Sequence, residues 1–171
     1  MRRFLVLALT LLAIPTIAHS EPARWSLDRA SFGVDAKGAV TEQGGQASSF
    51  LGGTYLSYSM TEQMSAAATV ERDFAGHLTI AKVGLRFPIF HLDGGNGRVT
   101  AAGNLVSYSD KGAEGIVEPT SWEAGVNGSW RLAENTGTTV LWGIVSAAYD
   151  PENARSTYRL GLRYQALGGR P

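Results

Sequence analysis

The chain contains no cysteine among its 171 residues. This absence excludes a disulfide-stabilised fold, a thiolate metal site and an N-terminal cysteine that carries a lipid anchor. Long hydrophobic runs are also lacking. After an apolar stretch within the first 20 residues, no segment reaches the length of about 20 residues that a membrane-spanning helix needs. The sequence therefore argues against a helical membrane protein.

Charge of one sign is not in excess either. The chain has 15 Lys and Arg and 15 Asp and Glu, so its formal net charge is zero. Nucleic-acid binding calls for a basic excess, so no nucleic acid is predicted as a partner. The P-loop, dinucleotide, zinc-protease and EF-hand motifs are missing. The sequence accordingly predicts no cofactor and no metal site, and the glycine-rich residues 93–97 are interpreted as a turn.

The first 20 residues have the pattern of a secretory signal peptide. Arg2 and Arg3 supply the positive start, residues 4–17 the apolar stretch, and residues 18–20 a small-x-small cleavage site. Cleavage after Ser20 leaves a chain of a length typical of one domain. We therefore predict a signal peptide at 1–20 and a single domain at 21–171.

After residue 20 the sequence alternates with a period of two, which is typical of β-strands with two different faces. Turn signals rich in Gly, Asn, Asp and Pro separate the alternating stretches. The predicted strands are 25–36, 46–60, 64–73, 77–89, 98–109, 121–132, 138–149 and 156–166. An even number of strands places both ends of a closed barrel on one side. The longest connections, 37–45 and 110–120, are expected together on the opposite side.

Five of these stretches separate cleanly into an apolar and a polar face. Between 122 and 132, Trp122 and Trp130 share one face, and Glu123 and Arg131 share the other. The strands at 98–109 and 138–149 are apolar on both faces, so the pattern does not orient them. Periodicity does not say which face is inside. A membrane barrel and a soluble lipocalin-like barrel that binds a small apolar ligand both remain open.

Aromatic residues near the strand ends favour the membrane barrel, because amphipathic rings prefer the two membrane interfaces. The rings near the proposed outer ends are Phe50, Tyr108, Trp122, Tyr149 and Tyr158. The rings near the opposite ends are Trp25, Tyr58, Phe87, Phe90, Trp130 and Tyr164. We predict in particular that Trp122, Trp130, Tyr158 and Tyr164 face the membrane interfaces.

The last strand carries the nearest approach to a motif. Tyr158-x-Leu160-Gly161-Leu162-x-Tyr164 places a glycine among alternating hydrophobic and aromatic positions. It resembles the terminal β-signal read by the outer-membrane assembly machinery, although the chain continues to Pro171 where family members often stop at the aromatic residue. The layout of residues 25–166 resembles the small eight-stranded outer-membrane barrels of the OmpA/OmpX type.

This resemblance implies an all-β fold, an eight-stranded antiparallel up-and-down transmembrane β-barrel. It implies residence in the outer membrane of a Gram-negative bacterium and a monomeric state. It also implies contact with outer-membrane lipid and lipopolysaccharide, and recognition by the assembly machinery.

Eight strands enclose a space just wide enough for side chains. The charged residues predicted to fill it are Arg29, Asp35, Glu71, Lys82, Arg86, Glu123, Arg131, Arg159 and Arg163. Because an unpaired buried charge costs several kcal/mol, we expect a network in which Glu71 and Glu123 pair with basic residues and plug the lumen. The basic majority in this set leaves a narrow anion-preferring pore as an alternative.

The predicted role is structural or one of surface interaction, with the loops 37–45 and 110–120 as the contact surface, because loops on a rigid barrel carry binding. A lipid A deacylase or acyltransferase is a further alternative, since His77 and Ser109-Asp110 lie at the outer ends of neighbouring strands. The deacylase pattern His-x-Ser is absent, because Leu78 and Thr79 follow His77. No catalytic residue is therefore predicted.

Overall fold

The computed structural model describes residues 29–43, 45–74, 78–92, 96–109, 116–135 and 139–167. The predicted signal peptide, Trp25, His77 and Asp110 lie outside these ranges. Within them, no helix is long and apolar enough to cross a membrane.

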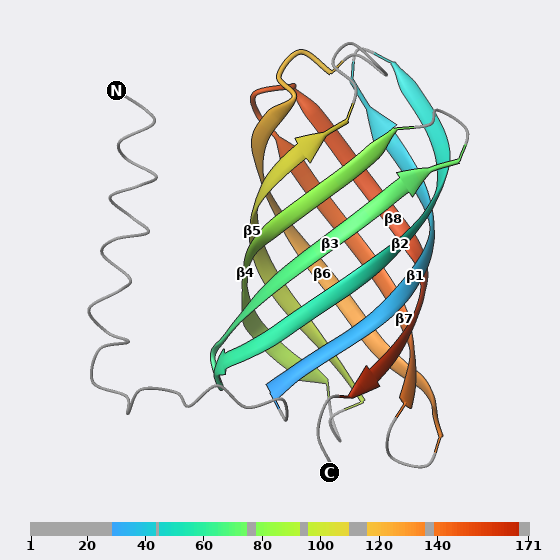
Figure 1. Ribbon diagram of the computed structural model, residues 1–171, viewed down its shortest axis with the longest axis vertical. Helices are drawn as coiled ribbons and strands as arrows, with labels where there is room; N and C mark the ends of the chain where they lie inside the picture. The colour runs from blue at the N-terminus through green and yellow to red at the C-terminus, as the bar shows by residue number, and fades with distance from the viewer. Residues whose placement is uncertain are drawn as a thin grey trace, which may run out of the picture.

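Eight antiparallel strands form a closed barrel, in which each strand pairs with its neighbours in sequence and the first pairs with the last (Figure 1). The strands are β1 (Ala30–Glu42), β2 (Gln46–Thr61), β3 (Met64–Asp73), β4 (Thr79–Leu92), β5 (Gly97–Tyr108), β6 (Thr120–Asn135), β7 (Thr139–Asp150) and β8 (Arg155–Leu167). The predicted fold class, strand number and order are confirmed. β1 begins and β8 ends at the same end of the barrel (Figure 1). We call this the terminal end and the opposite one the far end.

The boundary of β1 differs most from the prediction. The strand continues to Glu42, and residues 43–45 alone connect it to β2. The predicted loop at 37–45 is therefore wrong. Lys37 and Gly38 begin the predicted connection, but Lys37 is buried inside the barrel and Gly38 is an outward position that pairs with Leu160 of β8. In a sequence, a glycine within a strand is difficult to distinguish from a glycine in a turn.

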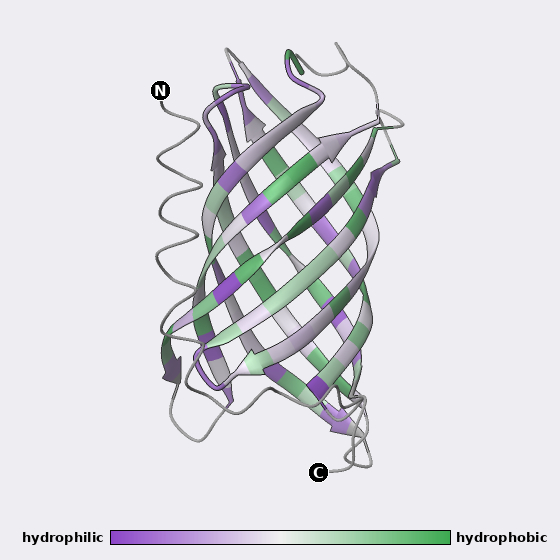
Figure 2. Cartoon of the chain, turned by 60° about the vertical axis from the view of Figure 1, so that its left-hand side comes forward, coloured by the Kyte–Doolittle hydropathy of each residue, from purple (hydrophilic) through white to green (hydrophobic). Residues whose placement is uncertain are grey.

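The outer surface of the barrel carries the large apolar side chains, and Figure 2 shows the hydrophobic and hydrophilic residues alternating along the strands. Trp122 and Trp130 are 40% and 36% exposed, whereas Arg159 and Arg163 are each 9% exposed. A soluble barrel that binds an apolar ligand needs the reverse arrangement. The lipocalin-like alternative therefore does not fit this structure.

The exposed rings lie near both ends of the barrel wall. Of the rings that the sequence assigns to the strand ends, those exposed on the far half are Phe50, Trp122, Tyr149 and Tyr158, and those exposed on the terminal half are Phe87, Phe90, Trp130 and Tyr164. Tyr108 is an exception, because its side chain is buried inside the barrel. Its assignment to the outer set of aromatic residues is wrong.

β5 and β7, the two strands that the sequence pattern did not orient, have apolar residues on both their inner and outer faces. Inside the barrel, Val106 of β5 and Val140 and Ile144 of β7 are buried. Outside, Leu105 of β5 and Val145 of β7 are exposed. Because part of the barrel interior is apolar, the hydropathy of these two strands does not alternate.

The charged interior as a candidate functional site

A chain of alternating charges crosses the barrel interior from β8 through β1 and β3. The guanidinium of Arg163 donates to both oxygens of Asp35, from Nε to Oδ1 at 2.6 Å and from Nη2 to Oδ2 at 2.8 Å. Lys37 Nζ lies 2.7 Å from Asp35 Oδ2 and 2.5 Å from Glu71 Oε1. Arg159 Nε ends the chain, 3.7 Å from Glu71 Oε2. Bidentate and charge-assisted bonds of this kind are the strong ones.

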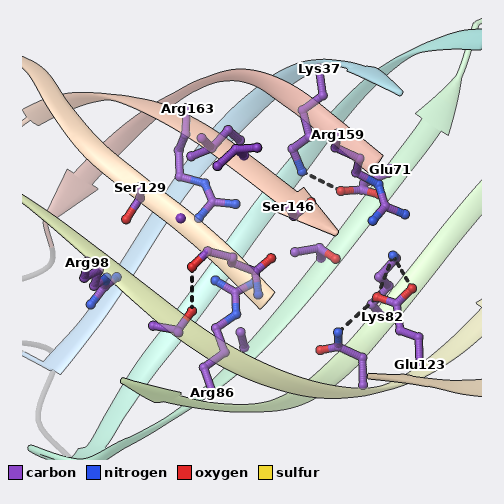
Figure 3. A pocket seen from close by; sticks show the side chains of 18 of the residues that line it. Lys37, Glu71, Lys82, Arg86, Arg98, Glu123, Ser129, Ser146, Arg159 and Arg163 are labelled. Atoms are coloured by element: carbon purple, nitrogen blue, oxygen red, sulfur yellow. Dashed lines mark hydrogen bonds and ion pairs between the residues drawn. The ribbon is translucent and has the colours of Figure 1, made fainter. Parts of the chain in front are cut away.

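A second ion pair joins β4 to β6. Lys82 Nζ donates to Glu123 Oε1 at 2.8 Å and to Oε2 at 2.9 Å. Asn104 Nδ2 of β5 also donates to Glu123 Oε1, at 3.0 Å. Figure 3 shows this group beside the Lys37–Glu71 pair, with Arg159 next to Glu71. The lysine and the carboxylate are buried, so each compensates the desolvation of the other.

Tyr55 of β2 provides an aromatic contact for two of the interior arginines. Its side chain is buried, and the guanidinium carbon of Arg163 lies 3.6 Å from the centre of its ring. The guanidinium carbon of Arg86, on β4, lies 4.9 Å from the same centre. A cation over an aromatic face is attracted by the ring quadrupole, and the attraction is larger where water is excluded.

Glycines on the inner wall make room for these long side chains. A Cβ at Gly161, between Arg159 and Arg163 in β8, would meet the carbonyl of Ala36 and the side chain of Lys37. A Cβ at Gly53 of β2 would meet Glu71. The interior of an eight-stranded barrel is narrow, so a large residue on one strand is matched by a missing side chain on the next.

The far end of the interior is packed differently. Leu78, Ile80, Val106, Tyr108 and Ile116 form a buried apolar cluster there. We call this group the far-end cluster. It adds apolar packing at this end of the interior, beside the buried charged residues Asp150 and Arg155.

Asp150, at the end of β7, collects hydrogen bonds above the far-end cluster. Its Oδ2 accepts from Ser121 Oγ at 2.6 Å and from Tyr108 Oη at 3.0 Å. Asn153 donates to both of its oxygens, from Nδ2 at 2.9 Å and from the backbone N at 3.1 Å. A buried carboxylate with this many donors is well compensated.

Asn153 also ties together the connections at the far end. Its Oδ1 accepts from the backbone N of Val117 and of Glu118, each at 2.8 Å. Its own carbonyl accepts from Gln43 Nε2 at 2.7 Å. The β7–β8 turn thereby holds residues 116–118 and the β1–β2 turn over the mouth, with Ile116 buried beneath.

Seven of the nine charged residues predicted for the lumen are inside the barrel. These are Asp35, Glu71, Lys82, Arg86, Glu123, Arg159 and Arg163. Arg29 and Arg131 are exposed instead. Arg29, which precedes β1, donates to the carbonyl of Met60, and Arg131 pairs with Glu134 beyond a bulge in β6. Both residues lie at the terminal end of the barrel. There a side chain at an inward position of the strand is not covered by the packed interior.

The sequence reasoning missed interior charges as well. Lys37 was assigned to a loop, and Asp73, Arg98, Asp150 and Arg155 were not considered. Lys37 is recoverable from the alternation Asp35, Lys37, Ala39, Thr41, all of which are buried. Among the buried residues that the structure describes, five are basic and five are acidic. The basic excess of the predicted set is absent from the buried interior as a whole.

The comparisons with known proteins agree with this geometry. No family model and no curated protein matches the sequence. Among solved structures, Neisserial surface protein A is similar, with a TM-score of 0.60 and 15% identity over 81% of this chain and 96% of that one.

Two further barrels are similar. The N-terminal β-barrel domain of OprF from Pseudomonas aeruginosa has a TM-score of 0.53 and 15% identity, over 79% of this chain and 96% of that one. A de novo designed transmembrane β-barrel has a TM-score of 0.53 and 12% identity, over 78% of this chain and 95% of that one. The chain thus has the fold of the small eight-stranded outer-membrane barrels, as the sequence predicted.

Proposed function

We propose that this protein is an integral outer-membrane β-barrel with a structural or surface-interaction role, whose lumen is plugged by its charged network. The observation that supports the proposal is the difference between the outer and inner faces of the barrel wall. Apolar and aromatic residues face outward, and paired charges such as Arg163–Asp35 and Lys82–Glu123 are buried inside. Only a lipid environment makes that outer surface favourable, because water would be in contact with a continuous apolar band.

The terminal end would face the periplasm and the far end the outside. Barrels of this class have short turns on the periplasmic side and longer loops outside. Here the connection after β5, residues 109–119, is at the far end, and the β2–β3 turn at the terminal end consists of residues 62–63. The contact surface proposed for lipopolysaccharide or another partner is therefore the 109–119 connection with the turns bound by Asn153.

An open anion pore is the weaker alternative. Each of the lumen carboxylates Asp35, Glu71 and Glu123 is paired with a basic side chain, and the far-end cluster adds apolar packing along the same path. Conductance through single barrels reconstituted in a planar bilayer tests the plug. We expect no steps of current with the wild-type chain in chloride. Discrete steps with anion selectivity would overturn the plugged lumen and favour the pore.

Catalysis is not part of the proposal. The Ser109 hydroxyl, one of the groups considered for it, accepts a hydrogen bond from the backbone N of Thr79 at 2.9 Å. The partner considered for it, His77, lies outside the described residues. Unchanged lipid A in cells that carry a His77→Ala variant is the expected result. A loss of lipid A modification in that variant would establish an enzyme.

Fractionation tests the location directly. We expect the mature chain in the outer-membrane fraction, with a gel mobility that changes on heating because the barrel resists detergent until boiled. Assembly that fails when the last strand is altered at Tyr164 would support recognition by the assembly machinery. Release of the intact chain by osmotic shock would contradict the membrane location.

A further inference from the structure

The middle of the barrel interior contains a cavity of about 70 Å³ whose walls are strongly basic and extend to Arg98 near the terminal end. Six basic residues line it: Lys37, Lys82, Arg86, Arg98, Arg159 and Arg163. Among the residues that the structure describes, the carboxylates seen in ion pairs with this set are Asp35, Glu71 and Glu123. The remaining acidic residues of the interior, Asp73 and Asp150, lie toward the far end. The buried charges balance over the described barrel as a whole, but around the cavity basic residues outnumber acidic ones.

Arg86 and Arg98 account for most of this surplus. Within the described part of the chain, no carboxylate lies within 4.0 Å of either guanidinium. Arg86 Nε is buried and has no hydrogen-bond partner among those residues. The cation–π contact of Arg86 with the Tyr55 ring is not a hydrogen bond to an oxygen or nitrogen acceptor, so the N–H donors of the guanidinium remain available for one. A buried cation without a partner is costly, so an anion here would relieve a cost that the protein itself leaves uncompensated.

The arrangement of the side chains is that of a binding site. Figure 3 shows the guanidinium groups of Arg86 and Arg163 directed into the cavity, from β4 and β8 on opposite sides of the barrel, with Arg98 at one end. Ser129 and Ser146 add hydroxyl donors to the same wall. The two carboxylates on the wall, Glu71 and Glu123, are held by lysines. A negative ligand between Arg86 and Arg163 therefore meets donors on both sides.

We propose that this cavity binds a small inorganic anion, of the size of chloride or phosphate, between Arg86 and Arg163. A cavity of about 70 Å³ corresponds to roughly five water positions, which excludes a sugar or a lipid headgroup. Arg98 is exposed at the start of β5 and marks the access route from the terminal end, while the buried side chains of the far-end cluster fill space toward the far end. The anion enters and leaves by the same end, so binding requires no transmembrane pore.

Thermal unfolding of the refolded chain in detergent tests the proposal without reference to its location in the cell. The midpoint is measured by circular dichroism in sodium chloride, sodium phosphate and sodium gluconate at one ionic strength, since gluconate is too large for the cavity. At ten times the dissociation constant, a bound anion raises the midpoint by about 4 °C over gluconate. The chloride and phosphate arms show which anion the site prefers.

Variants separate the site from general salt effects, which act on all chains alike. In Arg86→Gln the anion-specific shift is lost, and in Arg98→Gln, which alters an exposed residue, it is reduced. Arg72→Gln, an exposed position on the outer side of β3, keeps the full shift. Broadening of the ³⁵Cl NMR line by the folded chain gives a second readout for the same variants. Equal midpoints in the three salts, or the same shift and broadening in both Arg86→Gln and Arg98→Gln as in wild type, would overturn the anion site.

Discussion

Arg163 and Asp35 face each other directly across the seam where β8 closes on β1, and they are joined by two hydrogen bonds of 2.6 and 2.8 Å. The two residues are 128 positions apart in the chain. The pair therefore links the first and last strands. An open sheet of the same eight strands would lack this pairing of β1 with β8. Lys37 extends the link, because its ammonium lies 2.7 Å from the same carboxylate.

Removing the charge of Asp35 is expected to destabilise the closed barrel strongly. In Asp35→Asn, Arg163 and Lys37 both lose their shared counter-charge while remaining buried, and breaking a buried pair in this way costs about 3 to 5 kcal/mol. Urea unfolding of barrels in lipid vesicles, followed by tryptophan fluorescence, measures the change. Glu134→Gln is the matched control, because it breaks the exposed pair with Arg131, where a loss of at most about 1 kcal/mol is expected. Equal losses in the two variants would contradict this account of the seam.

Gly161 is expected to tolerate no side chain. A Cβ there would press on the backbone of Ala36 and on Lys37, whereas a Cβ at Gly103 would meet nothing within 4 Å. Gly161→Ala should therefore destabilise the barrel by about 1 to 3 kcal/mol, and Gly103→Ala should leave it unchanged or slightly more stable. Both glycines are within strands, so β-propensity alone predicts the same effect for both. Vesicle unfolding of the two variants distinguishes crowding from propensity.

The alternation of residues was sufficient to predict the barrel, because membrane exposure and a narrow polar interior impose opposite preferences on the two faces. The aromatic residues near the strand ends then favoured the orientation that the structure shows, with Trp122 outside and Glu123 inside. The alternation failed where that contrast disappears. The apolar interior at Val106 and Val140 made both faces of β5 and β7 look alike, and register across strands is needed to orient them.

The sequence pattern also did not give the depth of each residue along the barrel axis. Arg131 has the inward parity of Glu123, but the structure places it beyond the packed interior, next to a bulge. Parity reports a direction and contains no information on how far a strand extends past the barrel. The pairs Lys37–Glu71 and Lys82–Glu123 join residues 34 and 41 positions apart. Such partners follow from the register of three or more strands, which a single sequence does not specify.

Asn153 is expected to stabilise the connections at the far end and to have little effect on the stability of the barrel strands. Its side chain holds Val117 and Glu118 through three hydrogen bonds, and Asn153→Ala removes all three. We expect faster hydrogen exchange at the amides of residues 116–118 and earlier cleavage by added protease in this segment. Exchange in the middle of the strands should remain at the wild-type level. Glu152→Ala is the control, since Glu152 is exposed and its hydrogen bond to Asp150 is made by the backbone N, which the substitution keeps.

Leu160 and Val117 provide a direct test of whether lipid covers the wall. Their side chains are almost equally exposed, at 63% and 61%, but Leu160 is near the middle of β8 and Val117 is in the connection at the far end. An arginine near the centre of a bilayer costs a barrel about 2 to 4 kcal/mol and far less at the interface. Leu160→Arg should therefore fold poorly into vesicles, and Val117→Arg should fold as the wild type does. If water surrounded the wall, an arginine at either position would be solvated and both variants would fold equally well.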